Sequence, residues 1–238
     1  MKIALIGYGK MGKAIEEIAI AKGHEVVLKL DISNPEDFTI PNLKQCDVAI
    51  EFTSPHSAVG NLKKCFAAGL PVVCGSTGWL AEWAEVKQAC EASNGALVYA
   101  SNYSIGVNLF FELNTYLAKL MHNHADYEVL LEEIHHTEKK DAPSGTAITL
   151  AEQVLKHIAG KKQWVNHISD NTEDLEIISE RIDPAPGTHK IKYYSPIDDI
   201  EIIHTAHNRK GFAGGAVLAA EFVVGKKGIF NMKQVLGL

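Results

Sequence analysis

The sequence predicts an α/β protein in two parts: an N-terminal parallel sheet covered by helices, then an α+β domain with a mixed sheet. Up to about residue 102, short β-type runs alternate with helical stretches, which is typical of right-handed βαβ crossovers. In the later part of the chain, from residue 175 to 206, three expected strands succeed one another, and this favours antiparallel or mixed pairing. The length of 238 residues is compatible with one large or two small domains, and the change of pattern favours two.

The first part alternates buried apolar runs with helical stretches. Strands are expected at residues 1–6, 25–30, 47–52, 71–74 and 96–100, and helices at residues 11–22, 55–68 and 80–92. Strands connected in this way lie parallel, with helices on both faces of the sheet.

The second part opens with an amphipathic helix at 107–121, whose apolar residues recur every three to four positions. A strand at 127–134 and a helix from 144 to 159, closed by Gly160, follow. Further strands are expected at 175–182, 190–194 and 200–206, with a Pro184–Gly187 turn between the first two, and a buried helix at 214–224. We therefore place the domains at 1–104, completed by 215–238, and at 105–214.

A glycine motif joins the first strand to the first helix. Gly7-Tyr8-Gly9-Lys10-Met11-Gly12 has the form GxGxxG. Gly7 permits a tight turn, Gly9 lets the backbone approach a pyrophosphate, and Gly12 allows close packing of the helix. Because the free N–H groups and the dipole of the helix start favour an anion, this half resembles a dinucleotide-binding Rossmann domain.

An acid stands where such a site needs one. Asp31 ends the second expected strand, 19 residues after Gly12. A carboxylate there can accept both ribose hydroxyls of NAD and would repel a 2′-phosphate. The alternative is a helix cap or a solvated strand end. No arginine follows Asp31, so we expect NADH as the cofactor, with NADPH possible.

Three further loops follow strands at the same edge of the sheet, where the ligand crevice of an open parallel sheet lies. They begin at Glu51, Gly75 and Ser101. For the first loop, a helix N-cap before Pro55 is a sufficient structural explanation. The expected cofactor-binding residues are Gly7, Tyr8, Gly9, Lys10, Met11, Gly12, Asp31, Phe52, Thr53, Gly75, Ser76, Thr77, Ser101, Asn102 and Tyr103.

Composition argues against several other classes. The net charge is −6 and basic residues are not clustered, so a nucleic-acid partner is not expected. The apolar runs are too short to cross a bilayer or to form a signal segment. The four cysteines match no CxxC pattern, which favours reduced thiols in the cytoplasm. No metal site is expected, because the pairs His122/His124 and His204/His207 lack an evident third ligand.

The densest chemistry lies between an expected strand end and a helix start, in the segment Glu133–Thr146. Two imidazoles, His135 and His136, and Lys139 stand close to Ser-Gly-Thr, whose backbone N–H groups can bind a carboxylate. Histidine exchanges protons near neutral pH, and lysine neutralises a second carboxylate or donates a proton. Singly, each element has an ordinary structural explanation; their combination in one loop favours an acid–base site for a small dianion.

This segment, read as E-x-H-H-x-x-K-x-D-x-P-S-G-T, resembles the dihydrodipicolinate reductase family, and the resemblance covers nearly the whole chain. It extends to the glycine loop, to Glu51-Phe52-Thr53, to Gly75-Ser76-Thr77-Gly78 and to the run 100–108. The chain departs from the family pattern in a glycine loop one residue shorter, in Glu51 for aspartate and in Ser76 for threonine.

The resemblance implies NAD(P)H-dependent reduction of a cyclic imine to tetrahydrodipicolinate in diaminopimelate and lysine biosynthesis, by a homotetramer. It implies His135 and Lys139 as the acid–base pair, and which of them delivers the proton stays open. It also implies a small dicarboxylate substrate held by His136, Lys139, Ser144, Gly145 and Thr146. The alternatives are a two-domain dehydrogenase of another small acid and a non-catalytic NADH-binding sensor.

Overall fold

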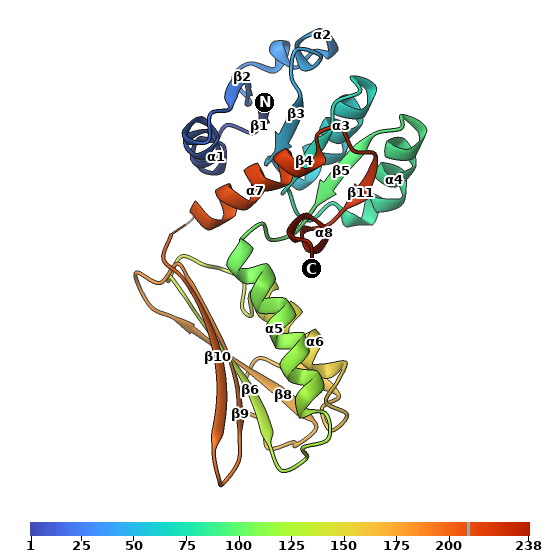
Figure 1. Ribbon diagram of the computed structural model, residues 1–238. Helices are drawn as coiled ribbons and strands as arrows, with labels where there is room; N and C mark the ends of the chain where they lie inside the picture. Colours follow the sequence, from blue (N-terminus) through green and yellow to red (C-terminus); the bar gives the residue numbers. More distant parts are fainter. Residues whose placement is uncertain (209) are drawn as a thin grey trace. The chain divides into compact units, whose positions relative to one another are not determined.

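The computed structural model describes residues 1–208 and 210–238 (Figure 1). The chain divides into two compact units, Met1–Ile105 with Lys210–Leu238, and Gly106–Arg209. Within the described part of the chain, no helix is both long and apolar enough to cross a membrane.

The first unit is built on a six-stranded sheet in the order β11-β5-β4-β3-β1-β2, and every neighbouring pair is parallel. The predicted parallel sheet is thus confirmed. Its strands are β1 (Lys2–Ile6), β2 (Glu25–Leu30), β3 (Val48–Glu51), β4 (Val72–Cys74), β5 (Ala96–Tyr99) and β11 (Gly228–Phe230). The chain order reverses between β1 and β3, and such a switch point is where open parallel sheets bind ligands.

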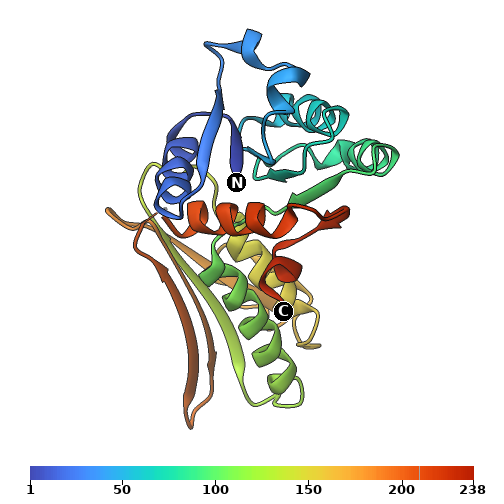
Figure 2. The same ribbon diagram turned by 45° about the horizontal axis from the view of Figure 1, so that its top comes forward.

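Helices cover both faces of this sheet. One apolar cluster joins it to α1 (Lys10–Ala21), α7 (Lys210–Val223) and α8 (Met232–Leu236), and a second joins it to α2 (Ile40–Leu43), α3 (Pro55–Ala67) and α4 (Trp83–Ala92). Two short 3₁₀ helices, η1 (Pro35–Asp37) and η2 (Leu80–Glu82), precede α2 and α4. Figure 2 shows α7, near the red end of the colour scale, running beside the dark blue α1.

The C-terminal segment joins the first unit, which explains its apolar composition. The helix expected at 214–224 is α7, and it begins four residues earlier, at Lys210. A Cβ atom on Gly215 would lie 1.7 Å from the carbonyl oxygen of Tyr103, so glycine is required for this close approach of helix and loop. Strand β11 and helix α8 were not predicted from the sequence, because they are short and acquire their structure by pairing with β5 and packing against α7.

The second unit is a five-stranded sheet in the order β10-β9-β6-β8-β7, with two helices on one face. The β10/β9 and β9/β6 pairs are antiparallel and the β6/β8 and β8/β7 pairs are parallel, so the predicted mixed sheet is confirmed. Its elements are α5 (Ile105–Met121), β6 (Glu128–His135), α6 (Gly145–Leu155), β7 (Gln163–Val165), β8 (Asp174–Arg181), β9 (Gly187–Tyr194) and β10 (Asp199–Ala206). An apolar cluster lies between the helices and the sheet.

Two predicted limits in this unit are wrong. Helix α6 ends at Leu155 rather than at 159, because the chain turns after Lys156 and Ile158 packs partly against the core. Strand β9 begins at Gly187 rather than at 190, because residues 188 and 189 pair with both β6 and β10, and Gly187 pairs with β10. The second difference adds His189 to the sheet, opposite Glu133.

Candidate active site

The glycine loop after β1 has the geometry that its sequence predicts. Gly7 has φ +96°, and a Cβ atom there would lie 2.0 Å from the carbonyl oxygen of Phe52. A Cβ atom on Gly12 would lie 2.4 Å from the carbonyl oxygen of Gly7. Gly9 differs, because no atom lies within 4 Å of its would-be Cβ position. Gly7 and Gly12 are therefore required by the fold, whereas Gly9 leaves open space beside the backbone.

The start of α1 is suited to an anion. Gly9 is its N-cap, no side chain caps the helix, and the first turn contains no acidic residue. The unpaired N–H groups and the helix dipole then favour a phosphate group at this position.

Two clefts meet at this helix start, with volumes of about 560 Å³ and 460 Å³. The larger extends towards Asp31, and the smaller towards Ser76; both contain Gly9 and Thr53. The predicted cofactor residues that line one or the other are Gly7, Tyr8, Gly9, Lys10, Met11, Gly12, Asp31, Phe52, Thr53, Gly75, Ser76 and Thr77. These residues therefore fit an extended dinucleotide.

Asp31 is exposed at the end of β2 and ionised. Its Oδ1 accepts hydrogen bonds from the Ser33 hydroxyl (2.6 Å) and backbone N–H (2.7 Å), and these two bonds lower the pKa of Asp31. The neighbouring Ile32 is fully exposed. A carboxylate held in this way at the rim of the larger cleft can accept ribose hydroxyls.

The three residues after β5 that were expected to bind the cofactor, Ser101, Asn102 and Tyr103, do not line the two clefts. Tyr103 is buried, and its hydroxyl lies within hydrogen-bonding distance of the carbonyl oxygens of Cys74 (2.8 Å) and Val98 (2.9 Å). Its side chain therefore belongs to the core of the unit. Ser101 is exposed and Asn102 is half-buried, and neither lines the two clefts described above.

A buried acid at the end of β3 organises the smaller cleft. Glu51 is fully buried, and its carboxylate accepts hydrogen bonds from the Thr53 hydroxyl, the Ser76 hydroxyl (3.1 Å) and the Asn61 amide (3.3 Å). The Ser76 hydroxyl also accepts the Thr53 N–H (2.7 Å). From the sequence, Glu51 was expected to begin a loop at the ligand edge and was noted as a departure from the family pattern. Its hydrogen bonds become visible only because β3 and β4 are adjacent.

In the second unit, the acid–base segment begins at the end of β6. Alternate residues of this strand are buried towards the helices, and the alternation continues from Val129 and Leu131 to Glu133 and His135. Both polar side chains are thus held on the inner face, with exposed fractions of 0% for Glu133 and 7% for His135.

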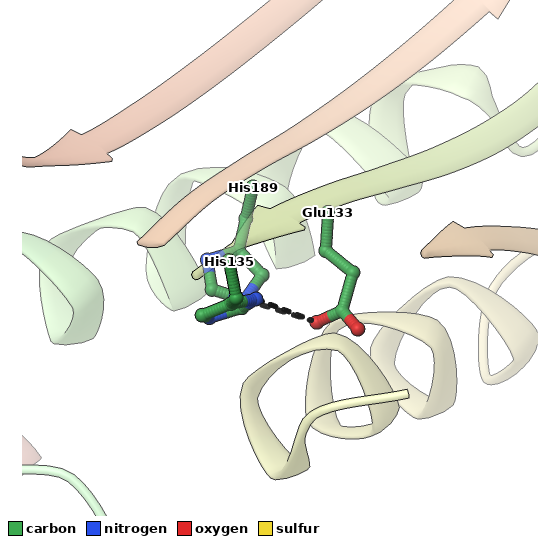
Figure 3. A group of neighbouring side chains, drawn as sticks. All are labelled: Glu133, His135 and His189. Carbon is green, nitrogen blue, oxygen red and sulfur yellow. Dashed lines mark ion pairs between the residues drawn. The ribbon is translucent and has the colours of Figure 1, made fainter. Parts of the chain in front are cut away.

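Figure 3 shows Glu133, His135 and His189 gathered on this face. The Nδ1 atom of His135 is 3.5 Å from Glu133 Oε2, within ion-pair distance but not aligned for a hydrogen bond. The two imidazole rings are 5.1 Å apart between centroids, at 72°. His189 Nε2 lies 3.7 Å from Glu133 Oε2 and shares a 3.1 Å hydrogen bond with the Ser144 hydroxyl.

The carboxylate of Glu133 is ionised despite its burial. It accepts the Ser144 N–H on both oxygens (3.1 Å each) and the Ser179 hydroxyl (2.8 Å), with Arg181 Nη2 at 3.3 Å. Burial by itself raises the pKa of Glu133, but the nearby His189 and the hydrogen bonds from Ser144 and Ser179 outweigh it and hold the pKa well below its usual range.

The remaining predicted substrate residues follow on the loop and at the start of α6. Lys139 pairs with both carboxylate oxygens of Asp141, at 2.8 Å each. The Ser144 hydroxyl caps α6 by accepting the Ala147 N–H (3.2 Å). Gly145 is exposed, and Thr146 and His136 are half-buried. The structure therefore places the predicted residues of this unit on one strand, loop and helix start.

The ligand atoms of Glu133, His135 and His189 lie within 4.8 Å of one another, a spacing that a cation could bridge. The carboxylate, however, already accepts the Ser179 hydroxyl, and the positive charge of Arg181 lies 3.3 Å from it. Occupied lone pairs and a cationic neighbour favour an acid–base cluster over a metal site. Sequence spacing could not reveal this cluster, because His189 lies 54 positions after His135.

The environment of His135 predicts a pH-dependent stability. Burial lowers the pKa of His135 from 6.5 to about 4; Glu133 opposes this shift, and His189, Lys139 and Arg181 add to it. The unfolded chain therefore binds a proton between pH 6.5 and 4 that the folded protein does not, so stability is lost as the pH falls through this window. The difference corresponds to roughly 3 kcal/mol.

We expect His135→Gln to flatten this part of the curve. Urea unfolding at pH values from 4 to 7 measures the free energy of unfolding, with the exposed His167→Gln as control. Equal slopes in all three proteins would contradict the burial of a neutral His135.

The fold and the two sites are those of an oxidoreductase with a nucleotide-binding domain: the first unit has the crevice of a dinucleotide-binding domain, and the second has a buried cluster of one carboxylate and two imidazoles. The chain belongs to the dihydrodipicolinate reductase family. The model of the family's N-terminal part matches residues 1–103, and the model of its C-terminal part matches residues 106–236.

The similar proteins that have names support this family membership. The 4-hydroxy-tetrahydrodipicolinate reductase of Christiangramia forsetii is 50% identical over 240 residues, which cover 99% of this chain and 98% of that protein. The enzyme of the same name from Methanosarcina mazei is 34% identical over 241 residues, covering 99% and 89%. The fold resembles dipicolinate-bound dihydrodipicolinate reductase from Paenisporosarcina sp. TG-14, with a TM-score of 0.80, 21% identity and 97% of both chains covered. The resemblance stated from the sequence is confirmed, and the chain is an oxidoreductase.

Proposed function

We propose that this reductase transfers a hydride from NADH to the cyclic imine derived from 4-hydroxy-tetrahydrodipicolinate, giving tetrahydrodipicolinate for diaminopimelate and lysine biosynthesis. The reductase function follows from family membership and from 50% identity over nearly the full chain. The observation that carries the chemical proposal is the placement of His135, Lys139 and the α6 start on one continuous segment.

The substrate is a small dianion, and the segment offers complementary groups for both of its carboxylates. We propose that the N–H groups at the start of α6, at Gly145 and Thr146, bind one carboxylate. Lys139 and His136 bind the other. Because Lys139 is paired with Asp141, a substrate carboxylate would replace Asp141 as its partner.

When bound, the reduced nicotinamide supplies the hydride, and the reduction is completed by a proton. His135 or Lys139 delivers that proton. With a pKa of about 4, His135 is neutral at pH 7 in the ligand-free protein. The negative charge of a bound dianion favours the protonated form of the His135 ring, so substrate binding would itself promote protonation of His135.

The function is tested by mixing the protein with NADH and a system that generates the imine, and by following the loss of reduced-nicotinamide absorbance. We expect rapid NADH oxidation that depends on the imine. Oxidation with other small keto acids but not with the imine would overturn the proposal and favour the dehydrogenase alternative. NADH binding without any turnover would favour the sensor.

The proposed preference for NADH depends on Asp31. We expect Asp31→Ser to lower kcat/KM for NADH and to move the NADH/NADPH ratio towards NADPH by about 10- to 100-fold, because bonds to a charged acceptor are worth about 1.5–3 kcal/mol. Steady-state kinetics with both cofactors measures the ratio. Glu36→Gln is the control, since Glu36 is exposed nearby and does not line the cleft. An unchanged ratio in Asp31→Ser would contradict the role of Asp31.

We further propose that the protein is a cytoplasmic homotetramer that associates through its second sheet, along the exposed side of the edge strand β10. This strand carries Ile203, which is 57% exposed. The free thiols of the four cysteines support a reducing compartment. Sedimentation equilibrium would measure the assembly, and a monomer at micromolar concentration would overturn it.

A further inference from the structure

We propose that Glu133 is a positioning residue of the reductase: one buried carboxylate fixes His135, the start of α6 and the loop that carries Lys139 in a single arrangement. Glu133 acts through these neighbours and does not itself touch the substrate. The inference rests on the proposed acid–base role of His135.

The position of Glu133 on a central strand brings residues of two neighbouring strands close to its carboxylate. It lies on β6, between β8 and β9, and its register partners on those strands are Ser179 and His189. Both partners direct polar groups at the carboxylate, at 2.8 Å and 3.7 Å. An unpaired carboxylate here would be costly, and the surrounding donors show that the site is built to hold one.

One connection leads to the proposed substrate cradle. The Ser144 N–H donates to both oxygens of Glu133 at 3.1 Å. Ser144 is the N-cap of α6, so this contact sets where the helix begins relative to β6. The N–H groups of Gly145 and Thr146 follow directly, and their direction depends on that anchor.

A second connection leads to the lysine loop. Arg181 Nη2 lies 3.3 Å from Glu133 and donates to the backbone carbonyl of Asp141 at 2.6 Å. The Asp141 carboxylate in turn holds Lys139. Glu133 is therefore linked through two residues to the lysine that is expected to bind or protonate the substrate.

The third connection is to His135 itself. Its Nδ1 is buried without a hydrogen-bond partner among the described residues and faces Glu133 at 3.5 Å, while Nε2 packs against Gly187. His189 on β9, Lys139 on the loop and Arg181 on β8 disfavour a second proton on the ring, and Glu133 favours it. The carboxylate thus offsets the positive charges of Lys139 and Arg181 at the moment when His135 must be protonated.

The test compares Glu133→Gln with Glu132→Gln. Glu132 is the adjacent residue of β6, faces the opposite side of the sheet and pairs with Lys190 at 2.9 Å, so it controls for charge loss on the same strand. We expect Glu133→Gln to lower kcat about 10- to 100-fold at neutral pH, and to move the alkaline limb of the kcat profile about one pH unit lower. We expect KM for NADH to stay unchanged in both variants.

A second variant keeps the inference testable if Glu133→Gln does not fold. Arg181 is partly exposed. Arg181→Gln removes a positive charge that disfavours protonation of the His135 ring, so the alkaline limb of the kcat profile should move to higher pH. A purely structural disturbance would not move the limb in opposite directions for the two variants. In a His135→Gln background, Glu133→Gln should add less than threefold to the loss of kcat, because both act on one proton transfer.

Unchanged pH limbs in Glu133→Gln and Arg181→Gln, or a fully additive double variant, would overturn the inference. Failure of the proposed function is a separate result, because it would appear as absent imine reduction in the unsubstituted protein. If the unsubstituted protein reduces the imine, and Glu133→Gln has the same kcat and pH profile as Glu132→Gln, only the positioning role of Glu133 is contradicted.

Discussion

His135→Gln should remove nearly all turnover while NADH still binds. General acid–base catalysis contributes about 10²- to 10⁴-fold, and kcat should fall by a factor in that range. Glutamine keeps a polar group in the buried site but cannot carry the proton. NADH affinity, measured by calorimetry, should be unchanged, because the residues expected to bind the nucleotide belong to the first unit.

Lys139→Ala should also lower kcat and, in addition, raise KM for the imine, because the variant lacks a carboxylate partner. Lys140→Ala is the matched control, since Lys140 is the exposed neighbour on the same loop. Near-normal turnover in both His135→Gln and Lys139→Ala would remove this segment from the mechanism. Loss in one variant alone would show which residue delivers the proton.

Gly7→Ala should destabilise the first unit and abolish nucleotide binding together. The added methyl group would stand 2.0 Å from the Phe52 carbonyl oxygen, in a backbone conformation that alanine rarely adopts. We expect a loss of about 2–4 kcal/mol in the free energy of unfolding. Urea unfolding and NADH titration measure the two effects.

Two glycines provide controls for this result. Gly9→Ala has open space in the ligand-free protein, so its stability should be nearly unchanged while NADH binds more weakly, because the methyl group would occupy the phosphate position. Gly60→Ala, within α3 and also free of contacts, should add about 0.5–1 kcal/mol to stability and leave NADH binding intact. Normal NADH affinity in Gly9→Ala would contradict phosphate binding at the start of α1.

Much of the first site could be predicted because its signals are local. The glycine loop, the following helix and Asp31 lie within one βαβ unit. Within such a unit, the spacing of apolar residues and the turn residues predict where the strands, the helix and the loop lie. Glu51 was not predicted to organise this site, because its partners Ser76 and Asn61 come from other segments. Tyr103 was expected at the cofactor, but burial of its hydroxyl against Cys74 and Val98 could not be inferred from a loop sequence.

In the second site, too, the residues close together in the sequence were predicted, and those on distant strands were not. His135, Lys139 and Ser144 stand in one segment, and their spacing on a strand, loop and helix start indicated an acid–base site. His189 and Arg181 were missed, because the expected strand began at 190 and no local pattern joins either residue to Glu133.

Most of the strands and helices, the glycine turn for an anion and the segment that carries the proton chemistry were predictable from the sequence, because each depends on residues near one another in the chain. The side chains that surround Glu133, the pairing of β11 in the first sheet and the start of β9 became known from the fold. Those features depend on pairing between distant strands, and it is this pairing that turns an isolated buried carboxylate into a stable, ionised centre of the site.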